Sequence, residues 1–210
     1  MNKDSSIFFP DTQYEQEYWS KGMFVAGADE AGRGSLSGPV VSAAVIFPIG
    51  TNNELGCRDS KVLSQAKREE LFLQIQEQAI GIGIGIIDSD IIDEVNIRVA
   101  TRLAMTSALE QLNHSPMHAL IDGNYFEHPS IPFRTVIKGD YHCFSIAAAS
   151  IIAKVTRDAI MQEIDTKVGS LYYFAQNKGY GTEAHRNAIR VHGPSKYHRK
   201  TFLTKIIHNE

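Results

Sequence analysis

The apolar residues in the first half of the chain predict three strands and a helix. The stretches at 23–29 and 39–47 are typical of strands, and the glycine-rich segment AGRGSLSG joins them. Ser64 is placed to cap a helix that runs to about residue 80, with apolar side chains at helical spacing. Residues 81–87 alternate Gly and Ile, which predicts a strand with one bare face.

The second half of the chain alternates helical and strand patterns. Residues 88–113 are helical with a break expected near Asn96, and 118–122 and 133–139 are short apolar strands. Residues 145–168 predict one long helix, whose first turns, SIAAASIIA, are so small and apolar that they must be buried against a sheet. This order predicts an α/β fold in which helices cover both faces of a mixed sheet.

Two terminal segments flank this central pattern. A short helix is expected at about 11–21, with Asp11 as its N-cap, and small helices are expected at 183–192 and 201–208. The chain is therefore expected to have an N-terminal extension, an α/β domain and a basic helical C-terminal region. These three parts cover residues 1–22, 23–170 and 171–210.

The composition is that of an ordinary globular protein, with 43% apolar and 21% charged residues. Cys57 and Cys143 lie far apart and form no CxxC pair, which argues against a disulfide framework and a zinc site. The first residues do not have the pattern of a signal peptide, and no apolar run is long enough to span a membrane. We therefore expect a cytoplasmic protein without a membrane partner.

The net charge of −3 conceals an uneven distribution. Residues 184–209 carry six cations and no carboxylate, whereas residues 1–183 carry 15 Lys and Arg against 23 Asp and Glu. A chain that is acidic in its body and basic at one end can hold polyvalent cations in one place and a polyanion in another. A solvated basic tail explains the same composition equally well.

Four carboxylates are the first candidates for chemistry. Asp29 and Glu30 close the strand at 23–29, Asp122 closes the strand at 118–122, and Asp140 closes the strand at 133–139. Neighbouring residues of a strand face opposite ways, so Asp29 and Glu30 are expected to share a site through a bend in the AGRG segment. Oxygen ligands without His or Cys favour Mg²⁺ or Mn²⁺, and a pair of such ions can cleave a phosphodiester. A turn cap explains each residue singly, but it does not explain why all four lie at strand ends.

The glycine-rich segment that follows is the second candidate. It lacks the Lys of a P-loop and the Ser of a nucleophile elbow. Gly32 and Gly34 leave the backbone uncovered on either side of Arg33, so the loop can approach a sugar-phosphate chain and read a 2′-hydroxyl. A simple tight turn is the alternative.

Other polar residues support a nucleic-acid partner less directly. Ser60 and Lys61 precede a helix and could hold a phosphate, although a cap and a surface lysine explain them equally well. Tyr180 lies in a basic glycine turn, where it either stacks on a sugar or base or fills the edge of the core. For Lys154, Arg157 and Asp158 we expect an internal ion pair on the long helix, with contact to a phosphate as the alternative.

Taken together, these segments resemble the ribonuclease HII family, the bacterial form of the second ribonuclease H class. The matching stretches are VAGADEAGRGSLSGPVV, DSKVLS, IDEVNI, LIDGN, VIKGDYHCFSIAAASIIAKVTRD, GYGTEAHRNAI and HGPSKYHRKTF. They follow the family's order over most of residues 24–202, and their combination is highly specific although no single piece is.

The resemblance implies a ribonuclease H-like fold and a metal-dependent endoribonuclease that uses two Mg²⁺ or Mn²⁺ ions. Such an enzyme acts on RNA–DNA hybrids and cuts 5′ to ribonucleotides embedded in duplex DNA, leaving 3′-OH and 5′-phosphate ends. The family's metal-binding carboxylates correspond to the four acids above. Gly32, Arg33 and Gly34 correspond to its sensor of the RNA–DNA junction, and Tyr180 corresponds to the tyrosine that packs under the deoxyribose after the ribonucleotide.

Two features separate the chain from the neighbouring ribonuclease HIII family, which usually departs from GRG and carries a large N-terminal domain. GRG is intact here, and 22 residues precede the first strand. The segment TFLTKIIHNE has no clamp-binding box, so we expect no sliding-clamp partner, and we expect a monomer. The alternatives are a hybrid-binding module that has lost catalysis, for which no carboxylate is missing, and a 3′ exonuclease that uses a similar acidic set.

Overall fold

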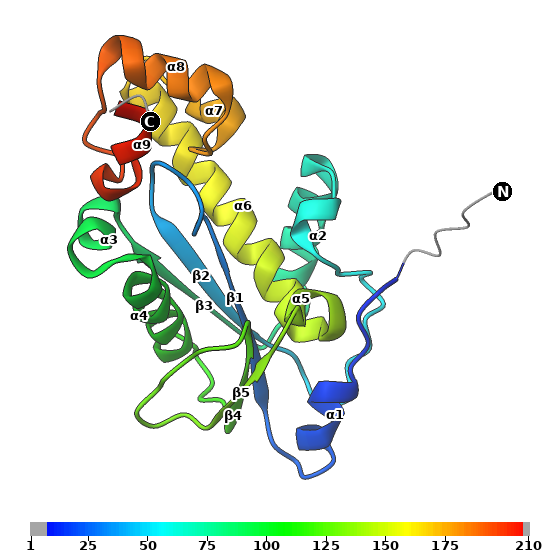
Figure 1. Ribbon diagram of the computed structural model, residues 1–210. Helices are drawn as coiled ribbons and strands as arrows, with labels where there is room; N and C mark the ends of the chain where they lie inside the picture. Colours follow the sequence, from blue (N-terminus) through cyan, green and yellow to red (C-terminus); the bar gives the residue numbers. More distant parts are fainter. Residues whose placement is uncertain (1–7, 208–210) are drawn as a thin grey trace, which may run out of the picture.

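One mixed sheet organises residues 8–207, the part of the chain that this computed structural model describes (Figure 1). Its strand order is β3-β2-β1-β4-β5. β1 pairs with β2 and β2 with β3 in antiparallel fashion, whereas β1–β4 and β4–β5 are parallel. The strands are β1 (Val25–Ala31), β2 (Val40–Ile46), β3 (Gly81–Ile87), β4 (His118–Asp122) and β5 (Phe133–Val136).

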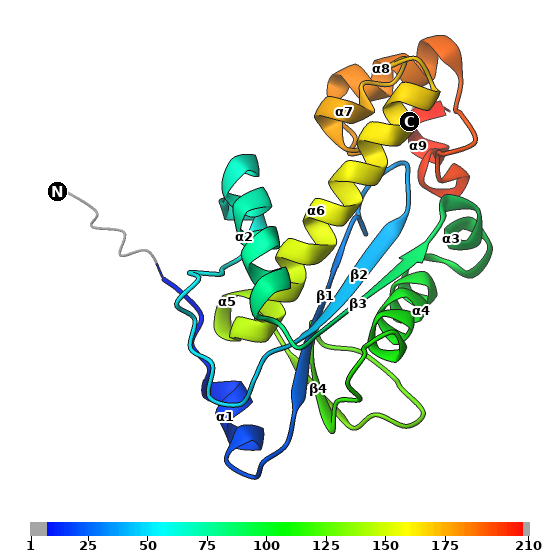
Figure 2. The ribbon, with the colours of Figure 1, turned by 180° about the vertical axis from the view of Figure 1, so that it is seen from behind.

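Helices cover both faces of the sheet, as the sequence predicts (Figures 1 and 2). α2 (Gln65–Gln78) and α6 (Phe144–Lys167) lie on one face, and α4 (Ile97–Glu110), with α3 (Ser89–Val95) beside it, lies on the other. The shorter helices are α1 (Gln13–Trp19), α5 (Gly139–His142), α7 (Phe174–Asn177), α8 (Glu183–His192) and α9 (Thr204–Ile207), with 3₁₀ turns η1 (Ser60–Val62) and η2 (Lys200–Phe202).

The bare face of β3 brings α4 close to the sheet. A Cβ atom added at Gly83 would lie 1.9 Å from the carbonyl oxygen of Ala108, and one at Gly85 would lie 2.0 Å from that of Ala104. Any side chain on this face would therefore push the helix away. The alternation of Gly and Ile in the sequence predicts this packing correctly.

The helix break near Asn96 is also confirmed. Asn96 has φ +70° and ψ 162°, and its side-chain oxygen accepts hydrogen bonds from the backbone N–H groups of Arg98 and Val99. Asn tolerates a positive φ better than most residues and is a strong N-cap. It therefore ends α3 and starts α4 in a single step.

Two strand boundaries differ from the sequence prediction. β1 does not stop at Asp29 but continues to Ala31, because β2 pairs with it as far as Val41 opposite Ala31. The predicted strand at 133–139 ends at Val136. Lys138 then adopts a left-handed conformation with φ +54°, and the chain turns into α5.

The N-terminal helix α1 packs onto β1 of the sheet and onto the start of α6. It begins after Thr12, not after the expected cap Asp11, whose backbone forms an isolated bridge with Cys143. The Glu15 carboxylate is buried and accepts a hydrogen bond of 2.7 Å from the backbone N–H of Ser145. A negative charge at this end stabilises the long helix α6.

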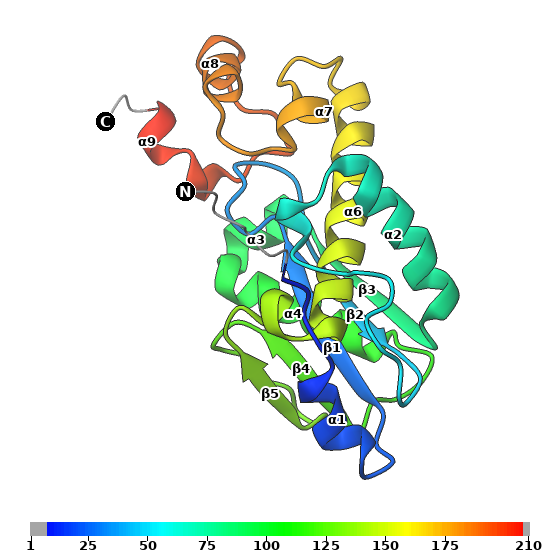
Figure 3. The same cartoon turned by 90° about the vertical axis from the view of Figure 1, so that its right-hand side faces the viewer.

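The C-terminal region lies at the end of α6 (Figure 3). A separate apolar cluster joins it to the last turns of this helix. It includes Met161 and Ile164 of α6 together with Phe174, Ile189 and Leu203. The helix expected at 183–192 is present, whereas the segment expected at 201–208 is divided between η2 and α9, and residue 208 lies outside the described part. Among the described helices, none has both the length and the apolar character that a bilayer crossing requires.

Candidate active site

Three carboxylates meet where β1 extends beyond β4. Ligand oxygens of Asp29, Glu30 and Asp122 all lie within 4.8 Å of one another. β4 pairs with β1 only as far as Ile121 opposite Ala28, so the two acids of β1 lie beyond the end of the parallel pairing. Both adjacent side chains reach the same space around this free edge. The expected bend in AGRG is therefore not what brings them together, because the strand runs on through both residues.

Asp122 is the last residue of β4, as the sequence predicts, and α5 fixes its orientation. Its Oδ1 accepts a hydrogen bond of 2.7 Å from the backbone N–H of Gly139, the first residue of α5. Asp140 follows within this helical turn, so the expectation that it ends a strand is wrong. It is buried, and its Oδ2 lies 3.5 Å from Nζ of Lys61. Asp140 is thus a neighbour of the three-carboxylate cluster, and the ammonium group of Lys61 contacts it.

The carboxylates crowd one another electrostatically. Burial, followed by the charges of Glu30, Asp122 and Asp140, raises the pKa of Asp29 well above its usual range. Burial also raises the pKa of Glu30, against the opposing effect of Arg33, whose Nη1 lies 3.4 Å from Oε1 of Glu30. Burial and the charge of Asp59 raise the pKa of Asp140, with Lys61 opposing. Such a set is stabilised by added positive charge.

A divalent cation fits this arrangement. The donor set contains only carboxylate oxygens, which suits Mg²⁺ or Mn²⁺ better than Zn²⁺. One Asp29 oxygen already accepts the backbone N–H of Glu30 at 2.6 Å, which fixes the orientation of that carboxylate. The residues present therefore have the chemistry and the spacing of a hard-cation site.

Two buried arginines hold the glycine-rich loop from behind. Arg157 donates to the carbonyl oxygens of Pro39 and Ser37 at 2.9 and 3.1 Å and to Oγ of Ser35 at 2.7 Å. Arg199 donates to the carbonyl oxygen of Gly38 at 2.9 and 3.0 Å, and to that of Arg33 at 2.9 Å. Burial lowers the pKa of both guanidiniums from their very high ordinary value. Their N–H groups donate mostly to backbone carbonyl oxygens, so these buried polar groups have hydrogen-bond partners.

The loop leaves no space for a side chain at Gly32. This residue has φ +94°, and a Cβ atom there would lie 2.0 Å from Nε of Arg157. A Cβ at Gly34 would meet no atom within 4 Å, so this part of the loop faces open space. The packing therefore explains Gly32 structurally and leaves Gly34 and Arg33 accessible.

The expected ion pair on α6 is only partly present. Lys154 and Asp158 form it, with 2.6 Å between Nζ and Oδ1. Arg157 points instead to the loop, which local spacing along the helix does not reveal. Arg199 was likewise not singled out from the sequence, although the HGPSKYHRKTF segment that contains it was part of the resemblance.

Tyr180 is held through two buried histidines. The Tyr180 carbonyl can only accept, so the 2.9 Å contact with His185 places a proton on Nδ1 of His185. The Ser195 backbone N–H donates to Nδ1 of His198 at 2.9 Å, which leaves the His198 proton on Nε2. This Nε2 donates to Nε2 of His185 across 3.0 Å. Two neutral rings thus connect the C-terminal segment to the backbone of Tyr180.

The Tyr180 side chain remains accessible on the α6 side of the site. Tyr180 is 39% exposed, so part of its side chain can be reached from solvent. Nζ of Lys154 lies 5.9 Å from the ring centroid and the Arg157 guanidinium carbon lies 5.5 Å from it. The ring is thus available for stacking and lies in a cationic environment.

Ser60 and Lys61 have different environments. Ser60 is buried in η1, and its backbone N–H donates to Oγ of Ser150 at 3.3 Å. The side chain of Lys61 is exposed, and it contacts Asp140 and Asp59 at 3.5 and 3.8 Å. Although burial lowers it, the pKa of Lys61 is raised overall by Asp59, Asp140 and Asp29. The structure therefore brings Lys61 to the edge of the carboxylate cluster, whereas Ser60 is buried beside Ser150.

Known proteins of the ribonuclease HII family share this architecture. The model of that family, described as ribonuclease HII, matches residues 26–205. The chain belongs to the ribonuclease HII family. Ribonuclease HII of Bacillus cereus strain G9842 is 48% identical over 201 residues, which cover 95% of this chain and 77% of the relative. Ribonuclease HII of Enterococcus faecalis is 47% identical, covering 95% and 78%.

Solved structures agree with this assignment. The crystal structure of ribonuclease H2 from Pyrococcus horikoshii OT3 superposes with a TM-score of 0.73 at 26% identity, over 89% of this chain and 98% of that one. The expected ribonuclease H-like fold and the choice of HII over HIII are thus confirmed. A ribonuclease HII is a ribonuclease H, so the chain is a metal-dependent endonuclease.

Replacing Asp29 by Asn should stabilise the metal-free protein. Because the pKa of Asp29 is raised in the folded protein, its ionised form lowers the free energy of unfolding. This loss is absent at a pH below the pKa of the unfolded state, and it is complete at a pH above the pKa of the folded state. In EDTA at pH 8, Asp29→Asn should raise the melting temperature by several degrees, with the gain vanishing toward pH 4. Mn²⁺ should then stabilise the wild type more than the variant.

Asp90 provides the matched control. It is exposed, and its Oδ1 also accepts the backbone N–H of the next residue, at 2.9 Å. Asp90→Asn should not raise the melting temperature at any pH. A metal-free Asp29→Asn protein that melts at or below the wild-type temperature at pH 8 would contradict the described electrostatics.

The histidine pair should make the protein sensitive to acid. Burial, with a smaller effect of the neighbouring His185, lowers the pKa of His198 to about 4. The neutral form of His198 contributes its full stability at a pH above about 6.5, the pKa of His in the unfolded state. This contribution is lost as the pH falls toward 4, the pKa of His198 in the folded state. His198→Gln should therefore lose less stability than the wild type between pH 6.5 and 4, as measured by urea unfolding. The exposed His114→Gln control should follow the wild type, and parallel curves for all three proteins would refute the assignment.

Proposed function

We propose that this ribonuclease H cuts the RNA strand of RNA–DNA hybrids and nicks duplex DNA 5′ to single embedded ribonucleotides. The observation that carries the proposal is the position of the glycine-rich loop directly after the carboxylates. Asp29 and Glu30 belong to the cation cluster, and Gly32 to Gly34 follow on the same strand end. Recognition of the 2′-hydroxyl and hydrolysis of the adjacent phosphate thus take place within one stretch of backbone.

The carboxylates would hold two divalent ions, Mg²⁺ or Mn²⁺. Asp29, the most buried of the three clustered acids, would help to hold both ions, while Glu30 and Asp122 would each help to hold one. Asp140, beside Lys61, would hold the second ion or position the attacking water. When bound, such ions lower the pKa of water and withdraw charge from the leaving oxygen, giving 3′-OH and 5′-phosphate ends.

Substrate selection would rest on the loop and on Tyr180. Arg157 and Arg199 fix the carbonyls of residues 33, 37, 38 and 39 toward the interior, so that the loop is rigid before substrate arrives. A rigid backbone at Gly34 can contact a 2′-hydroxyl that deoxyribose lacks. Tyr180 would pack under the next deoxyribose, which explains a preference for an RNA–DNA junction. This activity would place the enzyme in the removal of misincorporated ribonucleotides from DNA.

A duplex with one ribonucleotide tests this proposal. With Mg²⁺ or Mn²⁺, the wild type should produce a single nick on the 5′ side of that nucleotide, mapped on a sequencing gel, and EDTA should abolish it. Asp122→Asn should reduce the rate at least about a hundredfold, because several kcal/mol of charge stabilisation are lost. Asn can still accept the Gly139 N–H, so the fold should remain intact.

Asp90→Asn serves as the control for loss of one carboxylate and should cut at the wild-type rate. Binding of the duplex without any nick would favour a hybrid-binding module. Degradation from free ends, prevented by end-blocked substrates, would favour an exonuclease. Either result contradicts the proposed specificity.

A further inference from the structure

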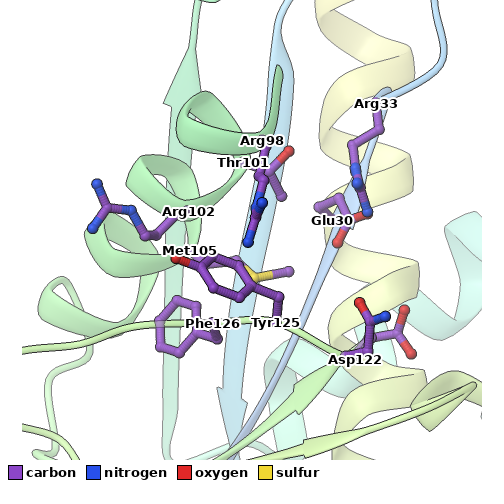
Figure 4. A pocket seen from close by; sticks show the side chains of 11 residues that line it. Glu30, Arg33, Arg98, Thr101, Arg102, Met105, Asp122, Tyr125 and Phe126 are labelled. Carbon is purple, nitrogen blue, oxygen red and sulfur yellow. The ribbon is translucent and has the colours of Figure 1, made fainter. Parts of the chain in front are cut away.

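A cavity of about 460 Å³ opens beside the carboxylates, on the side of α4 (Figure 4). Glu30 and Asp122 line its inner wall, and Arg33 lies at its rim. The opposite wall is formed by Arg98 near the start of α4 and by Tyr125 in the loop after β4. Its size is in the range of ligand-binding pockets, and it is continuous with the proposed cation site.

Arg98 differs from the other arginines of this cavity in its partners. Arg33 lies 3.4 Å from Glu30, and Arg102 lies 3.3 Å from Glu127. Within residues 8–207, no carboxylate oxygen lies within 4.0 Å of the Arg98 guanidinium. Its donors are therefore not used by an internal anion.

Tyr125 orients this guanidinium. The Arg98 carbon Cζ lies 3.8 Å from the centroid of the Tyr125 ring, which is stacking distance. The Tyr125 hydroxyl in turn donates to Glu127, which fixes the ring. A stacked guanidinium keeps its N–H groups at its edge, where they match two phosphate oxygens.

Arg98 and Tyr180 lie on opposite faces of the sheet. Tyr180 lies over Lys154 and Arg157 of α6, whereas Arg98 belongs to α4. These two helices cover opposite faces. A nucleic-acid strand that passes over the carboxylates therefore meets Tyr180 on one side and the cavity on the other.

We propose that Arg98, aligned by Tyr125, binds a phosphate of the cut strand on the 5′ side of the scissile bond. The direction rests on the proposed function, in which Tyr180 contacts the deoxyribose on the 3′ side of the ribonucleotide. The strand upstream of the cut then enters the cavity between α4 and the loop that carries Tyr125. The ligand of Arg98 is a phosphodiester group. Divalent cations held by Glu30 and Asp122 would neutralise the negative wall of the cavity.

Steady-state cleavage of the single-ribonucleotide duplex tests the contact. Arg98→Ala should raise KM about five- to tenfold while kcat changes less than twofold, since one exposed charge-assisted contact is lost. The slope of log KM against log salt should fall by about 0.9. Arg98→Lys should restore the salt slope but only part of the affinity, because it keeps the charge and loses the stacked fork.

Arg134→Ala is the matched control. The Arg134 guanidinium also lies over a tyrosine ring, that of Tyr14 at 4.9 Å, and it pairs with Glu17 of α1 outside the cavity. The KM of Arg134→Ala should stay within about twofold of the wild-type KM. Its salt slope should stay within about 0.2 of the wild-type slope, because no contact with a phosphate is lost. Circular dichroism melting of each variant establishes that it is folded.

Neutral methylphosphonates placed singly along each strand locate the phosphate. One substitution on the 5′ side of the scissile bond in the cut strand should weaken binding by the factor that Arg98→Ala causes, and the two changes together should cost no more than either alone. The assignment would be overturned if the effects of Arg98→Ala and of the methylphosphonate added independently at every position on the 5′ side. It would also be overturned if Arg98→Ala were coupled to a methylphosphonate in the complementary strand or on the 3′ side. If the wild type cuts this duplex and Arg98→Ala has an unchanged KM, the Arg98 contact alone is refuted. If the wild type does not cut the duplex, the proposed function is refuted.

Discussion

The burial of Asp29 and its repulsion by neighbouring carboxylates are the constraint on which the rest of this structure depends. Asp29 is 4% exposed, and its pKa is raised by burial and by three neighbouring acids. Clustered carboxylates without a positive charge beside them lower the stability of the folded protein. A bound cation would remove this loss of stability. The protein supplies only partial compensation, through Arg33 at Glu30 and Lys61 at Asp140. The remaining negative charge is what would attract a divalent cation to the cluster.

The sheet creates this crowding through a difference in strand length. β1 is held straight by β2 as far as Ala31, while its parallel partner β4 ends at Asp122. Adjacent residues of β1 can therefore reach one site although they start from opposite faces. The same extended strand end delivers the glycine-rich loop, and the buried guanidiniums of Arg157 and Arg199 set its shape. The carboxylate cluster and the glycine-rich loop are thus two consequences of one strand.

Much of this arrangement was predictable from local patterns. The bare face of β3, the helix break at Asn96 and the burial of α6 follow from glycine alternation, capping chemistry and small apolar residues within a few positions of one another. The acids Asp29, Glu30 and Asp122 were also identified from their place relative to apolar strands, and the structure brings them together.

The rest depends on pairings between distant segments, which local patterns do not encode. The end of β1 is set by its register with β2, and the place of Asp140 by a left-handed Lys138 that redirects the chain into α5. Helical spacing favoured an ion pair for Arg157, but the side chain serves a loop 118 to 122 residues away in sequence. The proton arrangement of His185 and His198 follows only once both rings and the Tyr180 carbonyl are in contact.

Anomalous X-ray scattering from crystals grown with Mn²⁺ tests the central claim most directly. The account predicts anomalous density bonded to the carboxylates of Asp29, Glu30 and Asp122, at oxygen distances of about 2.0–2.4 Å, typical of a hard divalent ion. Density should be lost in the Asp29→Asn protein under the same conditions. Crystals that contain Mn²⁺ elsewhere but leave these three carboxylates without density would contradict the account.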